Sequence, residues 1–229
     1  MWKAANAAGY HTLVSRRAYS TSTDKGSKVE ESSQADRHVS TQPRTAPSPS
    51  ENHLQTSLPH LTSSGAAHMV SVASKPSTER TAIATGTVRF SNPTPLSLIH
   101  AASNKKGDVL SVSRIAGIMA AKHTPTLIPL CHPIALTHVG VTLHVVLPGN
   151  GGEARDFGSI VVESKVSCTG QTGVEMEALT SVMGSALSVV DMCKAVDKGI
   201  SIGDVRVVLK EGGRSGTWRE EGWESRGEE

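Results

Sequence analysis

The chain has 229 residues, with 23 Lys and Arg against 21 Asp and Glu. It is long enough to bury a substantial core, and its nearly balanced charge argues against a broad cationic surface for duplex nucleic acid or an anionic membrane. Aromatic residues make up only 3% of the chain, so the stacking platforms of a single-strand binding surface are scarce. We therefore expect neither a nucleic acid nor a membrane as a partner.

The cysteines Cys131, Cys168 and Cys193 are widely spaced and form no Cys-x-x-Cys group. This spacing argues against a disulfide framework, a zinc ribbon and a cysteine-held iron-sulfur cluster. No apolar run approaches the roughly 18 residues of a membrane span. We expect a reducing compartment, no metal site and no cofactor.

The N-terminal segment 1–23 has no acidic residue, whereas Lys3, Arg16 and Arg17 occur among Ala, Ser and Thr. This composition is typical of a mitochondrial transit peptide and predicts import into the matrix. An ordinary disordered N-terminus of a cytoplasmic protein is the alternative. The next segment, 24–61, is rich in Ser, Thr, Pro and Gln, which predicts a disordered linker.

The folded domain is predicted to cover residues 62–216. Alternating Ala, Thr and Val indicate a strand over 81–90, and Thr94 with Pro95 predicts an N-cap and first turn of a short helix ending near residue 102. Asp108 is then expected to cap a second helix, 109–123. The apolar residues expected on one side of that helix are Ile115, Ile118 and Ala121.

The second half of the domain is predicted to contain a hairpin of strands 136–147 and 158–168, a long helix over 172–196 and a last strand over 201–210. The resulting β-α-β-β-α-β order is that of a ferredoxin-like α+β sandwich. In that fold an antiparallel four-stranded sheet carries its helices on one face. Residues 217–229 are predicted to be a charged flexible tail.

Two segments could bind an anion. Lys105 and Lys106 precede the helix capped by Asp108, and ammonium groups beside a helix N-terminus suit a phosphate, although solvated lysines at a capped helix are the simpler interpretation. Lys210 and Arg214 flank glycines that could expose backbone amides to a second anion.

The segment 127–133, LIPLCHP, holds Cys131 and His132 between two prolines. Prolines stiffen the backbone and fix the direction of the histidine, which favours a substrate contact or proton transfer. A buried structural histidine is the alternative.

The long helix contains several carboxylates. Thr172 and Glu175 have the spacing of a capping box, which leaves Glu177 without a structural role. Asp191 and Lys194 are three residues apart and predict an ion pair on the helix surface.

A narrow face of small residues joins Glu177 to Asp191 through Ser181, Gly184 and Ser188, at spacings of 4, 3, 4 and 3. The two carboxylates are separated by about 21 Å along a straight helix. One interpretation is that the helix packs antiparallel on its own copy near Gly184, which would create two composite sites per dimer. The other is that this face is exposed to solvent.

Several motifs occur together in one order: KGDV (106–109), RIAGI (114–118), IPLCHP (128–133), TGVEMEALT (172–180), DMCKAV (191–196) and the GGRSG loop (212–216). From residue 68 to 216 the sequence therefore resembles the MoaC family, the cyclic pyranopterin monophosphate synthases of molybdenum cofactor biosynthesis. The resemblance identifies 62–216 as the catalytic domain.

The resemblance implies a lyase that rearranges a 3',8-cyclised dihydro-GTP into cyclic pyranopterin monophosphate and pyrophosphate, without a cofactor. It also implies a hexamer formed as a trimer of dimers, sites between subunits, and a radical enzyme on a separate chain that supplies the substrate. The residues matching the family's catalytic set are Asp191, Lys106 and Lys194. Those matching its substrate-binding segments, or supporting them, are Leu130, Cys131, His132, Met176, Glu177, Glu175, Arg80 and Lys210.

Some positions depart from the family pattern. Ser71 and Ala73 stand in MVSVA where the family has MVDVS. His123 stands where the family usually has Arg or Lys, and Arg214 stands where it usually has Lys. These departures leave a second hypothesis open, a non-catalytic module on the same fold that binds a phosphate ligand or a partner.

Overall fold

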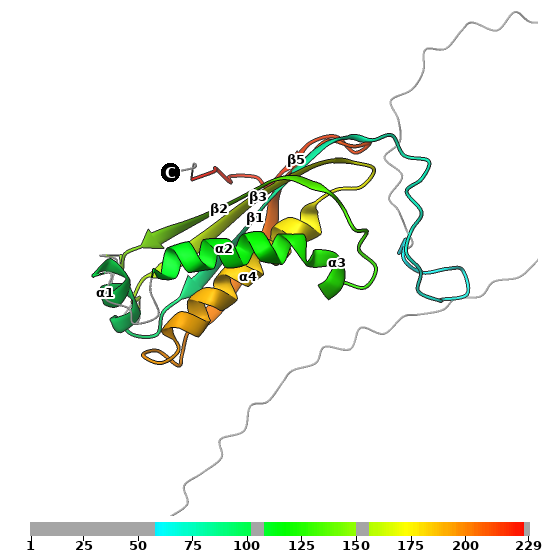
Figure 1. Ribbon diagram of the computed structural model, residues 1–229. Helices are drawn as coiled ribbons and strands as arrows, with labels where there is room; N and C mark the ends of the chain where they lie inside the picture. Colours follow the sequence, from blue (N-terminus) through cyan, green and yellow to red (C-terminus); the bar gives the residue numbers. More distant parts are fainter. Residues whose placement is uncertain (1–57, 102–107, 150–155, 227–229) are drawn as a thin grey trace, which may run out of the picture. The chain divides into compact units, whose positions relative to one another are not determined.

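The computed structural model describes residues 58–101, 108–149 and 156–226, which all lie in one unit, His53–Glu229 (Figure 1). The predicted transit peptide and all but the last four residues of the predicted linker lie outside the described residues. Lys105 and Lys106 lie outside them as well.

An antiparallel sheet forms one layer of this unit. Across the described residues its strands are β1 (Thr78–Arg89), β2 (Leu136–Val146), β3 (Ser159–Gly170), β4 (Ser201–Glu211) and β5 (Trp218–Arg219). Their spatial order is β2-β3-β1-β4-β5. The order of the four long strands is that of a ferredoxin-like sandwich, which confirms the predicted fold class.

The short strand β5 was not predicted. It pairs with β4 through Leu209↔Arg219 and Lys210↔Trp218, within the segment for which the sequence predicts a flexible tail. Charge and glycine content indicated exposure correctly, but they carry no information about a two-residue pairing at a sheet edge.

The helices are α1 (Thr94–His100), α2 (Val109–Lys122), α3 (Thr124–Leu127) and α4 (Glu175–Cys193). Figure 1 shows α2 and α4 side by side over one face of the sheet. Among the described residues, no helix combines the length and apolar character needed to cross a membrane.

The predicted cap of α2 is confirmed, and that of α1 is wrong. The Asp108 carboxylate accepts hydrogen bonds from the backbone N–H groups of Leu110 (3.0 Å) and Ser111 (3.2 Å). At α1 the N-cap residue is Pro93, and the Asn92 side chain accepts the N–H of Thr94 at 2.9 Å. The asparagine two residues upstream thus takes the role predicted for Thr94.

The buried face of α2 agrees with the prediction only in part. Ile115 is 63% exposed, whereas Ser113, Gly117 and Ala121 are buried. The helix turns its small residues inward because it packs closely on α4. Ile118 is partly buried against the core, as predicted. Val112, Ile115 and Met119 instead point outward and are exposed.

The core lies between the sheet and the helices. Alternate residues of β1 and β3 face it, as the two-residue period of a strand requires, and α4 contributes residues at helical spacing. The fully buried aliphatic side chains include Val88, Ile160, Val162, Val166, Val182 and Val189. Burying each of these contributes about 1.5–3 kcal/mol to the free energy of unfolding.

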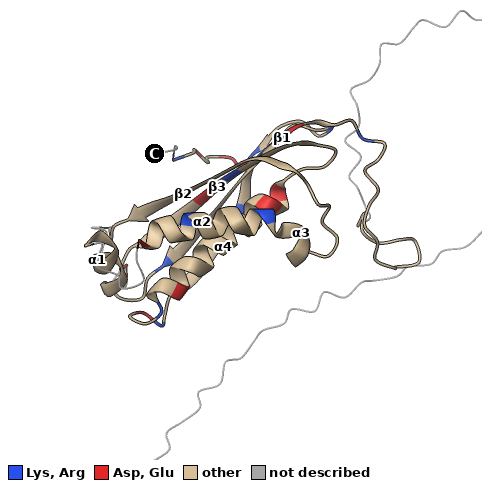
Figure 2. Cartoon of the chain, viewed as in Figure 1, with Lys and Arg blue, Asp and Glu red and all other residues tan. Residues whose placement is uncertain are grey.

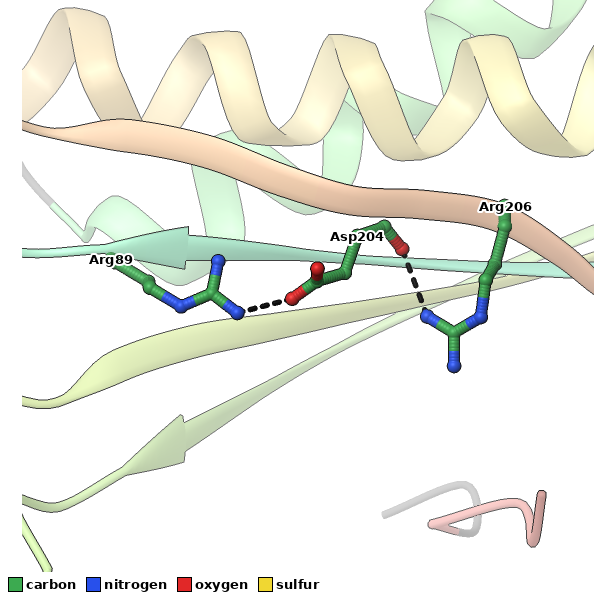
Figure 3. A network of polar contacts seen from close by, with 3 residues as sticks. All are labelled: Arg89, Asp204 and Arg206. Atoms are coloured by element: carbon green, nitrogen blue, oxygen red, sulfur yellow. Dashed lines mark hydrogen bonds and ion pairs between the residues drawn. The ribbon is translucent and has the colours of Figure 1, made fainter. Parts of the chain in front are cut away.

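The other face of the sheet is polar. Figure 3 shows Arg89 paired with the Asp204 carboxylate, and Arg206 donating to the Asp204 carbonyl oxygen at 3.0 Å. Arg206 also pairs with Glu220 at 2.6 Å, and the Ser225 hydroxyl donates to a Glu163 oxygen at 2.6 Å. Residues 218–226 therefore lie across this face, held by polar contacts.

Candidate active site

The N-terminal end of α4 does not have the predicted capping box. The N-cap residue is Val174, whose side chain makes no capping hydrogen bond. The preceding residues are held by tertiary contacts instead, since Arg80 donates to the Gly170 carbonyl and Gln171 donates to the carbonyls of Ala73 and Lys75. The helix consequently begins at Glu175, too late for Thr172 to cap it.

Glu175 faces a cation across this end of the fold. Its Oε1 atom lies 3.8 Å from the Lys210 ammonium group, which also donates to the Ser215 hydroxyl at 2.7 Å. Both side chains are about one-third exposed. Glu175 therefore belongs with the charged groups of the site.

Glu177 is buried, with 3% of its surface exposed. Burial raises the pKa of its carboxyl, and the neighbouring charge of Glu175 adds a smaller contribution in the same direction, although a hydrogen bond from its own backbone N–H acts against them. Burial also raises the pKa of the Cys131 thiol, with a smaller contribution from Glu177. The loop that contains Leu130, Cys131 and His132 thus reaches the N-terminal end of α4.

Arg80 lies on β1 at the same end. Its Nε atom donates to the Gly170 carbonyl at 2.9 Å, and a Cβ atom built on Gly213 would lie 2.2 Å from its guanidinium. A side chain at Gly213 would displace the guanidinium, and the φ of +73° at this position favours glycine. The glycine loop after β4 therefore closes against Arg80 and brings Lys210 to the same side.

Cys168 is a neighbour of this group that the sequence did not single out. It pairs with Arg80 in the sheet and is fully buried. Burial raises the pKa of its thiol, although the Arg80 charge acts in the opposite direction. The alternation of β3 toward the helices, through Val166 and Cys168, is the signal that could have placed it.

We call these residues the N-terminal group, because all lie around the first turn of α4. Its members are Arg80, Leu130, Cys131, His132, Glu175, Met176, Glu177 and Lys210. It combines two cations, a half-buried histidine and a carboxyl that retains a proton to higher pH than usual. Such a set can bind a phosphate and exchange a proton.

Asp191 and Lys194 form the C-terminal group at the other end of α4. The predicted ion pair is confirmed, with 2.6 Å between the Lys194 ammonium and Asp191 Oδ1. Both side chains are about 60% exposed, so an incoming ligand can reach them. Lys106, the third predicted catalytic residue, lies outside the described residues.

The two groups occupy opposite ends of one helix. Fourteen residues separate Glu177 from Asp191, a distance of about 21 Å at the rise of an α-helix. Figure 2 shows charged residues at both ends of α4 and none in its middle. The structure therefore brings most of the predicted residues together as two groups, and a single chain does not join these groups into one site.

The narrow face between the groups is neither exposed nor free to pack on a copy of α4, so both interpretations of it were wrong. It packs on α2 of the same chain. Ser113 donates to Ser188 at 3.1 Å, and a Cβ atom on Gly184 would lie 2.4 Å from that of Ala120. Farther along, Ser181 accepts a hydrogen bond from Ser164 of β3 at 2.7 Å. Small residues on α4 are thus required by its contacts within the chain.

The departures from the family pattern lie at exposed positions. The backbone carbonyl of Ala73, rather than its side chain, binds Gln171. Ser71, His123 and Arg214 are exposed.

Two cavities, of about 670 and 390 Å³, lie on the polar face of the sheet. Thr85, Glu163 and Arg206 are among the residues that line them, and no predicted site residue does. Among the described residues, no cluster of three or more His, Cys, Asp or Glu side chains is arranged to hold a metal ion.

Comparison with known proteins adds a family match. The model of the MoaC family matches residues 69–213. A Chloroflexus aggregans protein is 51% identical over 164 residues, covering 72% of this chain and 94% of that protein. A Parvibaculum lavamentivorans protein is 50% identical over 162 residues, covering 71% and 96%, and one from Dinoroseobacter shibae is 48% identical over 164 residues, covering 72% and 98%. All three are named cyclic pyranopterin monophosphate synthase.

Proposed function

The chain belongs to the MoaC family, and on this premise we propose that it is a lyase of molybdenum cofactor biosynthesis that converts a 3',8-cyclised dihydro-GTP into cyclic pyranopterin monophosphate and pyrophosphate. One structural observation supports the proposal most directly. The residues at the family's motif positions provide a buried carboxyl at one end of α4 and an aspartate-lysine pair at the other.

The N-terminal group is suited to binding the triphosphate and the base. Arg80 and Lys210 supply positive charge next to the glycine loop, where phosphate oxygens and departing pyrophosphate need it. Glu177 and His132 can donate or accept protons at ring atoms. Because the pKa of Glu177 is raised by burial, its carboxyl can keep a proton to donate.

The C-terminal group is suited to moving protons during ring opening and closure. Asp191 and Lys194 are held together at the surface, so each can exchange its partner for a substrate atom without a large rearrangement. We assign general acid and base roles to these two residues, together with Lys106. The Lys194 ammonium also stabilises negative charge that develops nearby.

A complete site requires a second chain in this proposal. The distance of about 21 Å between the two groups exceeds what one reacting centre can bridge. The outer side of the helix layer exposes Val112 (43%), Ile115 (63%), Met119 (46%) and Leu187 (57%) between the two ends. If two chains pack through this apolar surface about a two-fold axis, each N-terminal group meets the partner's C-terminal group. The hexamer, a trimer of such dimers, is proposed from the family resemblance.

A turnover assay with the cyclised nucleotide tests the reaction. Purified protein is expected to release pyrophosphate and cyclic pyranopterin monophosphate, and a radical enzyme on a separate chain can supply the substrate. Asp191→Asn should abolish turnover while leaving the fold intact. Binding of the nucleotide without any turnover would instead favour the non-catalytic module.

Mixing two inactive variants tests the composite site. Asp191→Asn and Glu177→Gln chains should each be inactive, but refolding equal amounts together should restore about a quarter of the wild-type rate. About half of the dimers are then mixed, and one of the two sites in each mixed dimer receives two intact groups. No recovery in a mixture shown to contain mixed oligomers would reject the shared site. Localisation in the mitochondrial matrix stays a prediction from residues 1–23.

A further inference from the structure

Asp197 is a buried aspartate that the catalytic assignments do not use. It follows the last turn of α4 and is only 2% exposed. Its Oδ2 atom accepts the backbone N–H of Ser91 at 2.7 Å, and its Oδ1 atom accepts the Ser91 hydroxyl and the N–H of Gly199 at 3.0 Å. The backbone of Asn92 contributes a further hydrogen bond. One carboxylate thus binds two segments that are more than a hundred residues apart.

These contacts hold Asp197 in its ionised form. Burial is the largest influence and would raise the pKa of Asp197, but the hydrogen bonds from Ser91, Gly199 and Asn92 together lower it. A neutral side chain of the same shape could not accept all of these bonds. The charge is therefore part of the anchor.

The anchor acts on the turn that carries the C-terminal group. The N–H of Asp197 donates to the Cys193 carbonyl at 3.1 Å, and the Asn92 side chain donates to the Val196 carbonyl at 3.2 Å. Lys194 lies between these two contacts in the sequence. Fixing Asp197 against the end of β1 thus fixes the position of the last turn of α4 and the direction of the chain that follows it.

We propose that Asp197 is a positioning residue for the reaction, because it anchors the end of α4 to Ser91 and so sets the orientation of the Asp191–Lys194 pair. This inference rests on the proposed function. Asp197 does not contact the substrate, and it acts through the geometry of the pair. The close approach of Gly199 supports the assignment, because a Cβ atom there would lie 2.4 Å from the Ser91 hydroxyl oxygen and would displace the anchor.

The test compares kinetic constants per folded chain, with the folded fraction measured by circular dichroism well below Tm. Asp197→Asn is expected to lower kcat at least tenfold and to change KM less than twofold, since the cations that bind phosphate lie at the other end of α4. Ser91→Ala, which removes one hydroxyl donor, should show the same pattern with a smaller loss. Asp204→Asn, an exposed aspartate on the polar face, is the matched control and should leave both constants unchanged.

Mixing separates positioning from general damage. Asp197→Asn chains should recover about a quarter of the wild-type rate when mixed with Glu177→Gln chains, but gain nothing with Asp191→Asn chains. Where Asp191→Asn and Glu177→Gln chains complement each other, equal recovery of Asp197→Asn with both partners, or recovery with neither, would overturn the inference. An unchanged kcat in Asp197→Asn and Ser91→Ala would overturn it in every case. If Asp191→Asn and Glu177→Gln fail to complement each other, the shared site is wrong, and the kcat and KM values then decide the role of Asp197. A wild-type chain without turnover would reject the proposed function itself.

Discussion

The hydroxyl of Ser113 on α2 donates a hydrogen bond to the hydroxyl of Ser188 on α4 across 3.1 Å. Two helices can share such a short contact only where their facing residues are small. Gly117 and Gly184 provide the same closeness farther along the pair. The distance between these helices therefore depends on residues that contribute almost no apolar surface of their own.

Gly184→Ala tests this packing. The new methyl group would lie 2.4 Å from the Ala120 Cβ atom, so the helices must separate, and we expect a loss of about 1–3 kcal/mol in the free energy of unfolding. Urea denaturation measures the loss. The double variant Gly184→Ala/Ala120→Gly should recover part of it, because it moves the methyl group to the other helix. Additive losses in the double variant would contradict direct contact.

Glu177→Gln should separate stability from activity. The folded-state pKa of Glu177 is raised, so the folded protein binds the proton more tightly than the unfolded chain, and ionisation costs stability as the pH rises from the unfolded pKa to the folded pKa. A glutamine has no such cost. The variant should therefore have a higher Tm than the wild type at neutral pH and a smaller or no advantage at acidic pH, while turnover is lost.

Thermal melts over a pH series measure this difference. Glu211→Gln, an exposed carboxylate at the end of β4, is the control and should change Tm little at any pH. A Glu177→Gln variant that melts below the wild type at neutral pH would show that the ionised carboxylate has a stabilising partner.

Lys210→Ala should weaken substrate binding more than it slows the chemical step. Lys210 lies beside the glycine loop and donates to Ser215. If it binds phosphate as proposed, its loss removes a charge-assisted contact worth about 1.5–3 kcal/mol. We expect KM to rise at least tenfold, with Lys210→Arg retaining most of the affinity. Lys165→Ala, an exposed lysine on β3, should leave KM unchanged, and an equal effect there would indicate a general influence of net charge.

Ile115→Asp should disrupt assembly. Ile115 is 63% exposed on the outer side of the helix layer, so the free chain tolerates a charge there, but a dimer that buries this surface does not. Light scattering should show a smaller species, with turnover reduced in parallel. Leu147→Asp provides the control, because Leu147 is similarly exposed (58%) beyond the end of β2. An unchanged, active oligomer in Ile115→Asp would place the interface elsewhere.

Much of the fold could be predicted because the strands alternate cleanly and the helix after β3 has a strong apolar stripe. The cap of α2 was predictable too, because Asp108 acts on its immediate neighbours. The capping box at Thr172 failed for the opposite reason, since Gly170 and Gln171 are held by distant residues and α4 begins later than local spacing indicates. Local patterns predict local contacts, and tertiary contacts can override them.

The site was predictable as two ends of a helix, because helical spacing fixes the distance between Glu177 and Asp191. What covers the face between them was not. Periodicity shows which residues share a face, but the partner of that face depends on the small residues of α2, which lie far away in the sequence. The anchor at Asp197 could not be predicted for the same reason, since its partner Ser91 lies 106 positions away in the sequence.

The central strand β1 runs between the same two ends as α4, with Arg80 near its start and Ser91 just after its end. An extra residue in β1 would displace one end by about 3.3 Å and reverse the faces of the residues beyond it. An extra residue in α4 would rotate one group by about 100° relative to the other. Insertions and deletions among relatives are therefore expected in the connection between β2 and β3, whereas β1 and α4 should keep a constant length.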